Sequence, residues 1–249
     1  MTLLHTLQIE TSRDIYGELL ADTYSQIHAD EFHLSPEMRH WWDALVAEYP
    51  HMPADEFLPG NGRYRYRRFD RFYFNPNSGE LRIMPHVDYF QDTDINQVTG
   101  GIVRKFAPLT DTLARNPFLH ELIRFDFAQF PMSAELRAGT WQVDVHMIRV
   151  VARAGEQGHP TPEGIHRDGG EYVTVHLAEL DNVAGGEVSI YDDNRAHLAS
   201  FTLQNVMDAY LFRDEVLWHG VAPLRPWVGN EGVRSILTFD YHYRPALQR

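Results

Sequence analysis

The sequence predicts a mainly β fold, a jelly roll in which helices from the N-terminal half cover one sheet. Helical patterns stop near residue 131, strand-like segments then follow at short intervals, and turn-forming pairs such as Gly169-Gly170 and Gly185-Gly186 separate them. The predicted strands of this half are 140–152, 163–168, 172–180, 186–191, 198–203, 208–213, 215–222 and 233–243. Many short strands at even spacing are typical of a double-sheet jelly roll, here with a core of about 140–243.

Three helices are predicted before that core. Residues 12–29 have a helical pattern, with Thr11 or Ser12 as the N-cap, and their apolar positions are Ile15, Leu19, Leu20 and Ile27. A second helix begins at Ser35-Pro36-Glu37 and ends near Pro50, with an apolar stripe of Met38, Trp41, Trp42, Leu45 and Tyr49. A third begins at Asn116-Pro117 and ends before Pro131. We expect these helices to pack on the outer face of one sheet.

One strand is predicted among the helices. Residues 63–74 alternate arginine with aromatic residues, which predicts tyrosines on one face and arginines on the other. The arginine face has two interpretations. It is either a solvent-facing sheet surface, or a place where Arg65 or Arg67 meets an anionic group of a substrate.

Composition limits the class of protein. A formal charge of −13 argues against nucleic-acid binding, because phosphates require a basic surface. With no cysteine, any metal must be held by nitrogen and oxygen ligands. The N-terminus has no signal-peptide pattern, and no apolar run approaches the roughly 18 residues of a membrane span. We therefore expect a cytoplasmic protein that binds neither nucleic acid nor membranes, and no heptad repeat predicts an oligomeric state.

Domain organisation follows from the absence of internal boundaries in the sequence. No linker-like or low-complexity stretch divides the chain, and no repeat of fixed period is visible. We expect one domain over residues 1–249, with a helix-rich first half and the jelly-roll core in the second.

The triplet His166-Arg167-Asp168, followed much later by His219, predicts a mononuclear iron site. In an extended strand successive side chains alternate, so His166 and Asp168 share one face and Arg167 points away. Two histidines and one carboxylate leave half of an octahedral Fe(II) open for a co-substrate and O2. Arg234 begins the strand-like run Arg-Ser-Ile-Leu-Thr-Phe-Asp-Tyr, where its planar guanidinium can bind a carboxylate at two points.

A second pair, His86 and Asp88, has the same spacing. Its possible third ligands, His120 and His146, lack a comparable downstream signature, and we expect the pair to lie in an exposed loop. Three other histidines, each alone in a strand-like segment, are expected to have structural or surface roles: His176, His197 and His242. Motifs of serine hydrolases, nucleotide-binding loops and zincins are absent from the sequence.

Several segments resemble one enzyme family. They are Pro162 to Gly170, Val183 to Asp192, His219 to Pro223 and, more loosely, Gly100 to Phe106. They are similar to the Fe(II)/2-oxoglutarate-dependent dioxygenases that include bacterial L-isoleucine 4-hydroxylase. The resemblance implies a double-stranded β-helix, which is a cupin-like jelly roll. It also implies Fe(II), 2-oxoglutarate and O2, with ascorbate as a supporting reductant, and a free aliphatic L-amino acid such as isoleucine, leucine or methionine as the substrate to be hydroxylated or sulfoxidised.

The resemblance also implies roles for individual residues. His166, Asp168 and His219 would bind iron, and Arg234 would bind the distal carboxylate of 2-oxoglutarate. Many related oxygenases have a serine two residues after this arginine, but here that residue is Ile236, so Thr238 is the candidate for the missing hydroxyl.

A free amino acid also requires partners for its two charged groups. Arg65, Arg67 and Arg149 are candidates for its carboxylate, and Glu163 and Glu171 for its ammonium. Two other functions stay open at this point. The same chemistry could act on a peptide, a protein side chain or another metabolite, or the jelly roll could be a non-enzymatic sensor or sugar-binding module with a structural metal.

Overall fold

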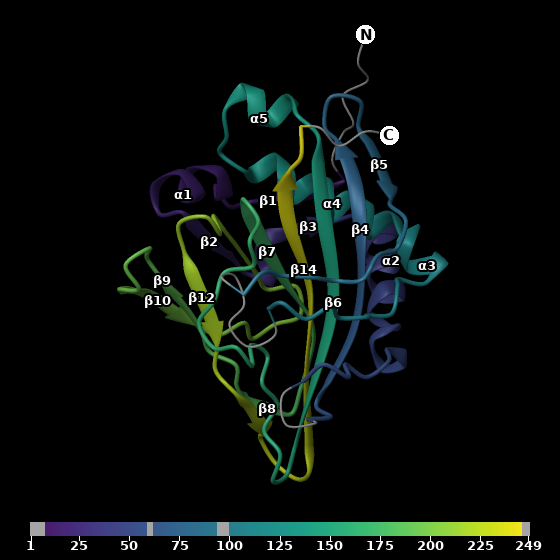
Figure 1. Ribbon diagram of the computed structural model, residues 1–249, viewed down its shortest axis with the longest axis vertical. Coiled ribbons are helices and arrows are strands. Elements are labelled where there is room, and N and C mark those ends of the chain that lie inside the picture. Colours follow the sequence, from purple (N-terminus) through teal and green to yellow (C-terminus); the bar gives the residue numbers. More distant parts are fainter. Residues whose placement is uncertain (1–7, 59–61, 94–99, 246–249) are drawn as a thin grey trace.

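The structure is a computed structural model that describes residues 8–58, 62–93 and 100–245, and these form a β-sandwich with helices on one side (Figure 1). The large antiparallel sheet has seven strands, in the spatial order β2 (Tyr24–Ile27), β11 (Ala209–Phe212), β7 (Tyr172–Asp181), β14 (Glu231–Tyr243), β6 (Trp141–Arg153), β4 (Arg65–Asn75) and β5 (Glu80–Ile83). The smaller sheet has the order β10 (His197–Phe201), β9 (Val188–Tyr191) and β12 (Trp218–Val221). The predicted jelly roll is confirmed.

Two short strand pairs and the helices complete the fold. The pairs are β8 (Val183–Gly185) with β13 (Leu224–Pro226), and β1 (Ile9–Thr11) with β3 (Phe32–Leu34). The α-helices are α1 (Ile15–Ala21), α2 (Pro36–Val46), α3 (Asp111–Ala114), α4 (Pro117–Gln129) and α5 (Ala134–Ala138), and short 3₁₀ turns cover Ala29–Glu31 and Tyr49–His51. No helix within the described ranges is long and apolar enough to cross a membrane.

Alternation along β14 divides the interior into two sides. Leu237, Phe239 and Tyr241 belong to the large apolar cluster that α1, α2 and α4 cover on the outer face of the sheet. Figure 1 shows α2 and α4 behind β4 and β6, on the far side from β9, β10 and β12. The intervening residues of β14, beginning with Arg234, face the smaller sheet instead. A second apolar cluster joins β7 to β9 between the sheets, and the functional pocket lies on this inner side.

The second and third predicted helices are confirmed as α2 and α4. The Ser35 side chain caps α2 by accepting a hydrogen bond from the Met38 backbone N–H at 3.1 Å. The Asn116 side chain caps α4 in the same way. Both helices have proline in the first turn, where its missing N–H costs nothing.

The first predicted helix is too long. It ends at Ala21 and its cap is Asp14, whose side chain accepts from the Gly17 N–H, in place of Thr11 or Ser12. Thr23, with a left-handed φ of 69°, turns the chain into β2. Ile27 fits both a helical and a strand period, and here it is a buried strand residue.

The predicted strand 163–168 is wrong. This segment is irregular and pairs only through one isolated bridge between His166 and His219. Gly164 and Gly169, with φ of 80° and 96°, bend the chain out of the extended conformation on either side. The other predicted strands of the second half are present, and their ends differ from the prediction by at most three residues.

Candidate active site

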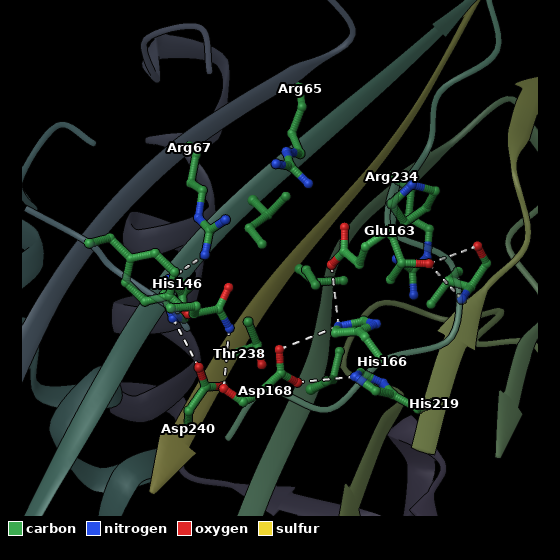
Figure 2. A pocket seen from close by; sticks show the side chains of 18 of the residues that line it. Arg65, Arg67, His146, Glu163, His166, Asp168, His219, Arg234, Thr238 and Asp240 are labelled. Carbon is green, nitrogen blue, oxygen red and sulfur yellow. Dashed lines mark hydrogen bonds and ion pairs between the residues drawn. The ribbon is translucent and has the colours of Figure 1, made fainter. Parts of the chain in front are cut away.

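A pocket lies between the two sheets, and six strands contribute to it. Its walls come from β4, β6, β7, β11 and β14 of the large sheet, from β12 of the smaller one, and from residues outside the strands, namely Tyr89, Gln91, Arg104 and the segment 160–168. Figure 2 shows Asp168 beside His166 and His219 on one side, with Arg67, His146 and Asp240 grouped across from them. The apolar part of the lining is Ile148, Val175, Val221 and Ile236.

His166, Asp168 and His219 form the one group of possible metal ligands found among the described residues. One ligand atom from each lies within 4.8 Å of the other two. The Nε2 atom of His219 is 3.0 Å from one Asp168 oxygen, and that of His166 is 3.4 Å from the other. The structure therefore brings together the three residues that the sequence nominated.

Backbone pairing sets this geometry. His166 and His219 exchange two backbone hydrogen bonds, N–H to carbonyl, at 2.9 and 3.0 Å. Residues paired in this way project to the same face, and the two imidazole rings lie 4.4 Å apart. Arg167 points away, as expected, and its guanidinium stacks over Trp218 and pairs with Asp193.

The other ring nitrogen of each histidine also has a neighbour. Nδ1 of His166 donates to the Gly164 carbonyl at 3.1 Å, which leaves the lone pair of Nε2 for a metal. Nδ1 of His219 is 3.4 Å from the Tyr210 hydroxyl. Each imidazole is thus oriented from behind, with Nε2 toward Asp168.

Strong electrostatic coupling marks the three residues. Burial alone would lower the pKa of His166, but the Glu163 and Asp168 carboxylates outweigh it and raise the value to about 10. Burial would raise the pKa of Asp168, yet the two histidines hold it well below its ordinary value. For His219, burial and the neighbouring His166 lower the pKa. The neighbouring carboxylates therefore favour positive charge at this place, either as a proton on His166 or as a bound cation that replaces it.

Asp214, which follows β11, holds the loop that carries Asp168. Its carboxylate accepts the backbone N–H groups of Asp168 at 3.0 Å and of Gly169 at 2.6 Å. Asp214 is 1% exposed, and burial together with repulsion from Asp168 raises its pKa to about 7. Sequence reasoning missed this residue, because nothing in the local pattern distinguishes it from a turn aspartate.

Arg234 enters the pocket from β14. It is 3% exposed, and its Nη2 has no hydrogen-bond partner in the described part of the chain. Burial lowers its pKa, and no carboxylate of the described residues pairs with this buried cation. Thr238 and Ile236 line the same pocket, whereas Ser235 faces the other way, because side chains alternate along a strand, and donates to Glu179.

The second group of arginines lies across the pocket. Arg65 and Arg67 are 4% and 8% exposed, so the solvent-facing interpretation of this strand is wrong for both. Arg65 pairs with Asp55 at 2.8 Å, and Arg67 contacts Nδ1 of His146 at 2.7 Å. Arg104 also lines this side and donates to the Gln91 side chain at 2.6 Å.

The other nominated residues differ in position. Glu163 lines the pocket, with its carboxylate 3.4 Å from Nε2 of His166. Arg149 and Glu171 do not line it. Arg149 points to the helix side of β6 and pairs with Glu179, because it is out of phase with His146 and Ile148. Glu171 accepts from the Tyr243 backbone N–H.

The second His-x-Asp pair lies on the surface, as expected. His86 pairs with Asp70 at 2.7 Å, and Asp88 is exposed. His120 donates to the Ala114 carbonyl, so it faces away from this pair. The other histidines also have local partners, which are Asp126 for His176, Ser200 for His197 and Asp144 for His242.

Residues 47–240 match the family described as 2OG-Fe dioxygenase. The chain belongs to this family. It is 27% identical over 186 residues to the L-isoleucine-4-hydroxylase of Bacillus thuringiensis, and the match covers 74% of this chain and 77% of that protein. It is 24% identical over 215 residues to the 3(1)-hydroxy-L-isoleucine 4-dioxygenase of Pantoea ananatis, covering 86% and 85%.

A solved structure agrees with the fold. The crystal structure of a bsmA homolog from Methylobium petroleophilum PM1 has a TM-score of 0.80 and 27% identity, and the match covers 93% of this chain and 94% of that one. The predicted resemblance to Fe(II)/2-oxoglutarate dioxygenases is therefore confirmed.

The dioxygenase uses Fe(II), with 2-oxoglutarate and O2 as co-substrates, and its residues fit these groups. The donor set of two imidazoles and one carboxylate suits Fe(II) and occupies only part of its coordination sphere. The unpartnered Nη2 of Arg234 matches the need of a dicarboxylate for a second anchor.

Asp240, Arg104, Gln91 and Tyr89 were not nominated from the sequence. Asp240 could have been found, because it lies six residues after Arg234 and therefore on the same face of β14. Burial raises its pKa well above the ordinary value, and repulsion from Asp168 adds to the effect. The other three lie outside the helices and strands, in parts of the sequence that have no periodic pattern.

Replacing Asp214 with Asn should weaken iron binding by about 10- to 100-fold, which is typical for residues that orient metal ligands. The two carboxylate oxygens of Asp214 accept one N–H group each, from Asp168 and Gly169. An asparagine amide has only one accepting oxygen, so the loop that carries Asp168 loosens. Anaerobic calorimetry with Fe(II) measures the effect, and the exposed neighbour Glu215→Gln is the control. Equal Fe(II) affinity in the Asp214 variant and the wild type would show that the loop does not depend on this contact.

Proposed function

We propose that this dioxygenase oxidises a free aliphatic L-amino acid, hydroxylating a carbon of isoleucine or leucine or adding oxygen to the sulfur of methionine. One observation carries the proposal. The pocket that contains the proposed iron ligands also contains three buried arginines, Arg67, Arg104 and Arg234, without a carboxylate partner among the described residues, and apolar side chains share the same lining. A small molecule with a carboxylate and an aliphatic side chain matches this combination. Two relatives support it, because their names give isoleucine and hydroxy-isoleucine as the compounds on which they act.

The roles of the protein side chains follow from their positions. We assign His166, Asp168 and His219 as the three protein ligands of Fe(II). Arg234 pairs with the distal carboxylate of 2-oxoglutarate, and Thr238 donates a second hydrogen bond to it from the same face of β14. The burial of both side chains and the missing partner at Arg234 support this assignment.

The iron and 2-oxoglutarate, when bound, supply the oxidation, in which one atom of O2 enters the substrate and the other enters succinate as CO2 leaves. The protein holds the reactants and excludes water. Arg234 fixes the far end of 2-oxoglutarate, which directs its keto acid end toward the ligand triad. Ile148, Val175, Val221 and Ile236 give the substrate side chain an apolar surface. Gly164 and Tyr210 keep both imidazoles in orientation.

A small substrate is favoured over a peptide or a protein side chain. Arg67 and Arg104 are both more than nine-tenths buried, so the charged end of a ligand must enter the protein to reach them. Membership of the dioxygenase family also argues against the alternative of a non-enzymatic metal-binding jelly roll. We further propose that the chain is one dioxygenase domain, because a single sheet combines β2, β4 and β14.

Incubation of the purified protein with Fe(II), ascorbate, 2-oxoglutarate and twenty pooled L-amino acids in air should convert one amino acid to a product heavier by one oxygen atom. Mass spectrometry identifies that amino acid, and succinate should form in equal amount. Asp168→Ala should form neither product, because the iron loses its carboxylate ligand.

Asp88→Ala is the matched control, since it removes the carboxylate of the exposed His-x-Asp pair, and it should retain full activity. Succinate without any oxidised amino acid would contradict the proposed substrate class. Full activity of the Asp168 variant would contradict the ligand assignment.

Arg234→Met should chiefly raise the KM for 2-oxoglutarate. Loss of a buried arginine–carboxylate pair costs about 2–4 kcal/mol, or roughly 30- to 1000-fold in affinity. Steady-state kinetics with 2-oxoglutarate as the varied substrate measures the change, with Ser235→Ala as the control because Ser235 faces the opposite side. An unchanged KM for 2-oxoglutarate would move the dicarboxylate anchor to another arginine.

A further inference from the structure

Two buried guanidinium groups, those of Arg67 and Arg104, have no carboxylate partner among the described residues. Arg67 and Arg104 are 8% and 2% exposed. Arg67 contacts His146 and Arg104 contacts Gln91, both neutral partners, and the Nε atom of each arginine has no hydrogen-bond partner within the described ranges. Burial lowers the pKa of Arg104 to about 10, and repulsion from Arg67 contributes. A buried charge of this kind requires an anion that the described part of the chain does not supply.

Arg65 differs from these two. Both its Nε and Nη2 atoms lie 2.8 Å from the Asp55 carboxylate, which is itself buried. Arg65 is therefore neutralised before any ligand arrives. Of the two arginines of β4 that the sequence nominated for an anionic group, the structure favours Arg67.

Aromatic rings hold Arg67 and Arg104 in place. The Arg67 guanidinium carbon is 4.3 Å from the Phe106 ring centre and 5.3 Å from that of Tyr89. The Arg104 carbon is 4.7 Å from the Tyr89 centre and 5.6 Å from that of Phe106. The two cations share two ring faces, so they are oriented before a ligand binds.

His146 links this cationic pair to an acid. Arg67 can only donate, so Nδ1 of His146 accepts from it, and Nε2 therefore carries the hydrogen that it donates to Asp240 at 3.1 Å. His146 is the side chain that holds Asp240, which is 2% exposed, through a hydrogen bond. A carboxylate and a guanidinium thus face the pocket one imidazole ring apart.

We propose that Arg67 and Arg104 bind the α-carboxylate of the substrate and that Asp240, oriented by His146, binds its α-ammonium. This inference rests on the proposed function. An α-amino acid carries its two charges on one carbon, so it needs an anion site and a cation site side by side, as here. Glu163 fits the ammonium less well, because its carboxylate lies 3.4 Å from Nε2 of His166, the atom that we assign to iron. Arg234 is left to 2-oxoglutarate.

The arrangement makes a prediction about ligand chemistry. Removing either charge of the substrate leaves a buried protein charge unpaired, so it should weaken binding by about 30-fold or more. A deaminated carboxylic acid leaves Asp240 unpaired, and a primary amide leaves the two arginines unpaired. Peptides and N-acyl amino acids lack one or both charges on the reacting residue and are rejected for the same reason.

The test is calorimetric binding of the twenty L-amino acids to the anaerobic Fe(II) and 2-oxoglutarate complex, followed by the deaminated acid and the primary amide of the tightest ligand. In the wild type both analogues should bind at least about 30-fold more weakly. Arg104→Gln should weaken binding of the amino acid but leave binding of the primary amide nearly unchanged. Asp240→Asn should weaken binding of the amino acid but leave binding of the deaminated acid nearly unchanged.

Controls separate this result from a folding defect or a general loss of the site. Affinity for 2-oxoglutarate should stay constant in both variants, and it should fall only in Arg234→Met. Arg149→Gln removes an arginine from the opposite face of β6 and should change nothing. Wild-type binding of the analogues requires no variant, so it decides the question even if a variant does not fold.

Several outcomes overturn the inference. One is equal affinity for the amino acid and its two analogues. Another is that Arg104→Gln weakens binding of the amino acid and of its amide equally. The third is that no amino acid binds. If an amino acid binds in a way that depends on Arg104 and Asp240 but is not oxidised, the result would support the inference and contradict the proposed function. Oxidation of an amino acid that neither variant affects would do the reverse.

Discussion

The alternation of side chains along β14 is the constraint on which the rest of the structure depends. One face of this central strand supplies Leu237 and Phe239 to the core beneath the helices. The other face supplies Arg234, Thr238 and Asp240 to the pocket. A shift of one residue in its register would bury the charged set under α4 and turn the apolar set toward the iron site. Folding and function therefore select the same register.

The two charged ends of the pocket have different physical origins. Arg234 is isolated on its strand and lacks a carboxylate within the described residues. Arg67 and Arg104 share aromatic faces and connect through His146 to Asp240. His166, Asp168 and His219 lie in the same pocket as both. A dicarboxylate and a zwitterion need different partners, and we propose that each binds at its own end of the pocket.

Much of the site could be predicted from sequence because its residues follow strand alternation or a fixed spacing. His166, Asp168, Arg234 and Thr238 belong to such patterns, and the structure brings them to one pocket. The prediction failed where irregular backbone decides. The segment around His166 is a loop held by a single bridge to His219.

Arg104 and Gln91 both lie outside the helices and strands, so their position beside Arg67 could be found only from the three-dimensional structure. The fold was predictable for the long strands and for helices with a proline and a capping residue at the start, as in α2 and α4. The short strand β2 was missed because Ile27 suits a helical period as well as a strand.

Anomalous diffraction at the iron edge, from crystals grown anaerobically with Fe(II) and 2-oxoglutarate, tests the central claim most directly. We expect one iron peak bonded to His166, Asp168 and His219, with the distal carboxylate of 2-oxoglutarate on Arg234 and the Arg67 side of the pocket left for substrate. An iron peak at His86 and Asp88, or a distal carboxylate on Arg67 and Arg104, would contradict it.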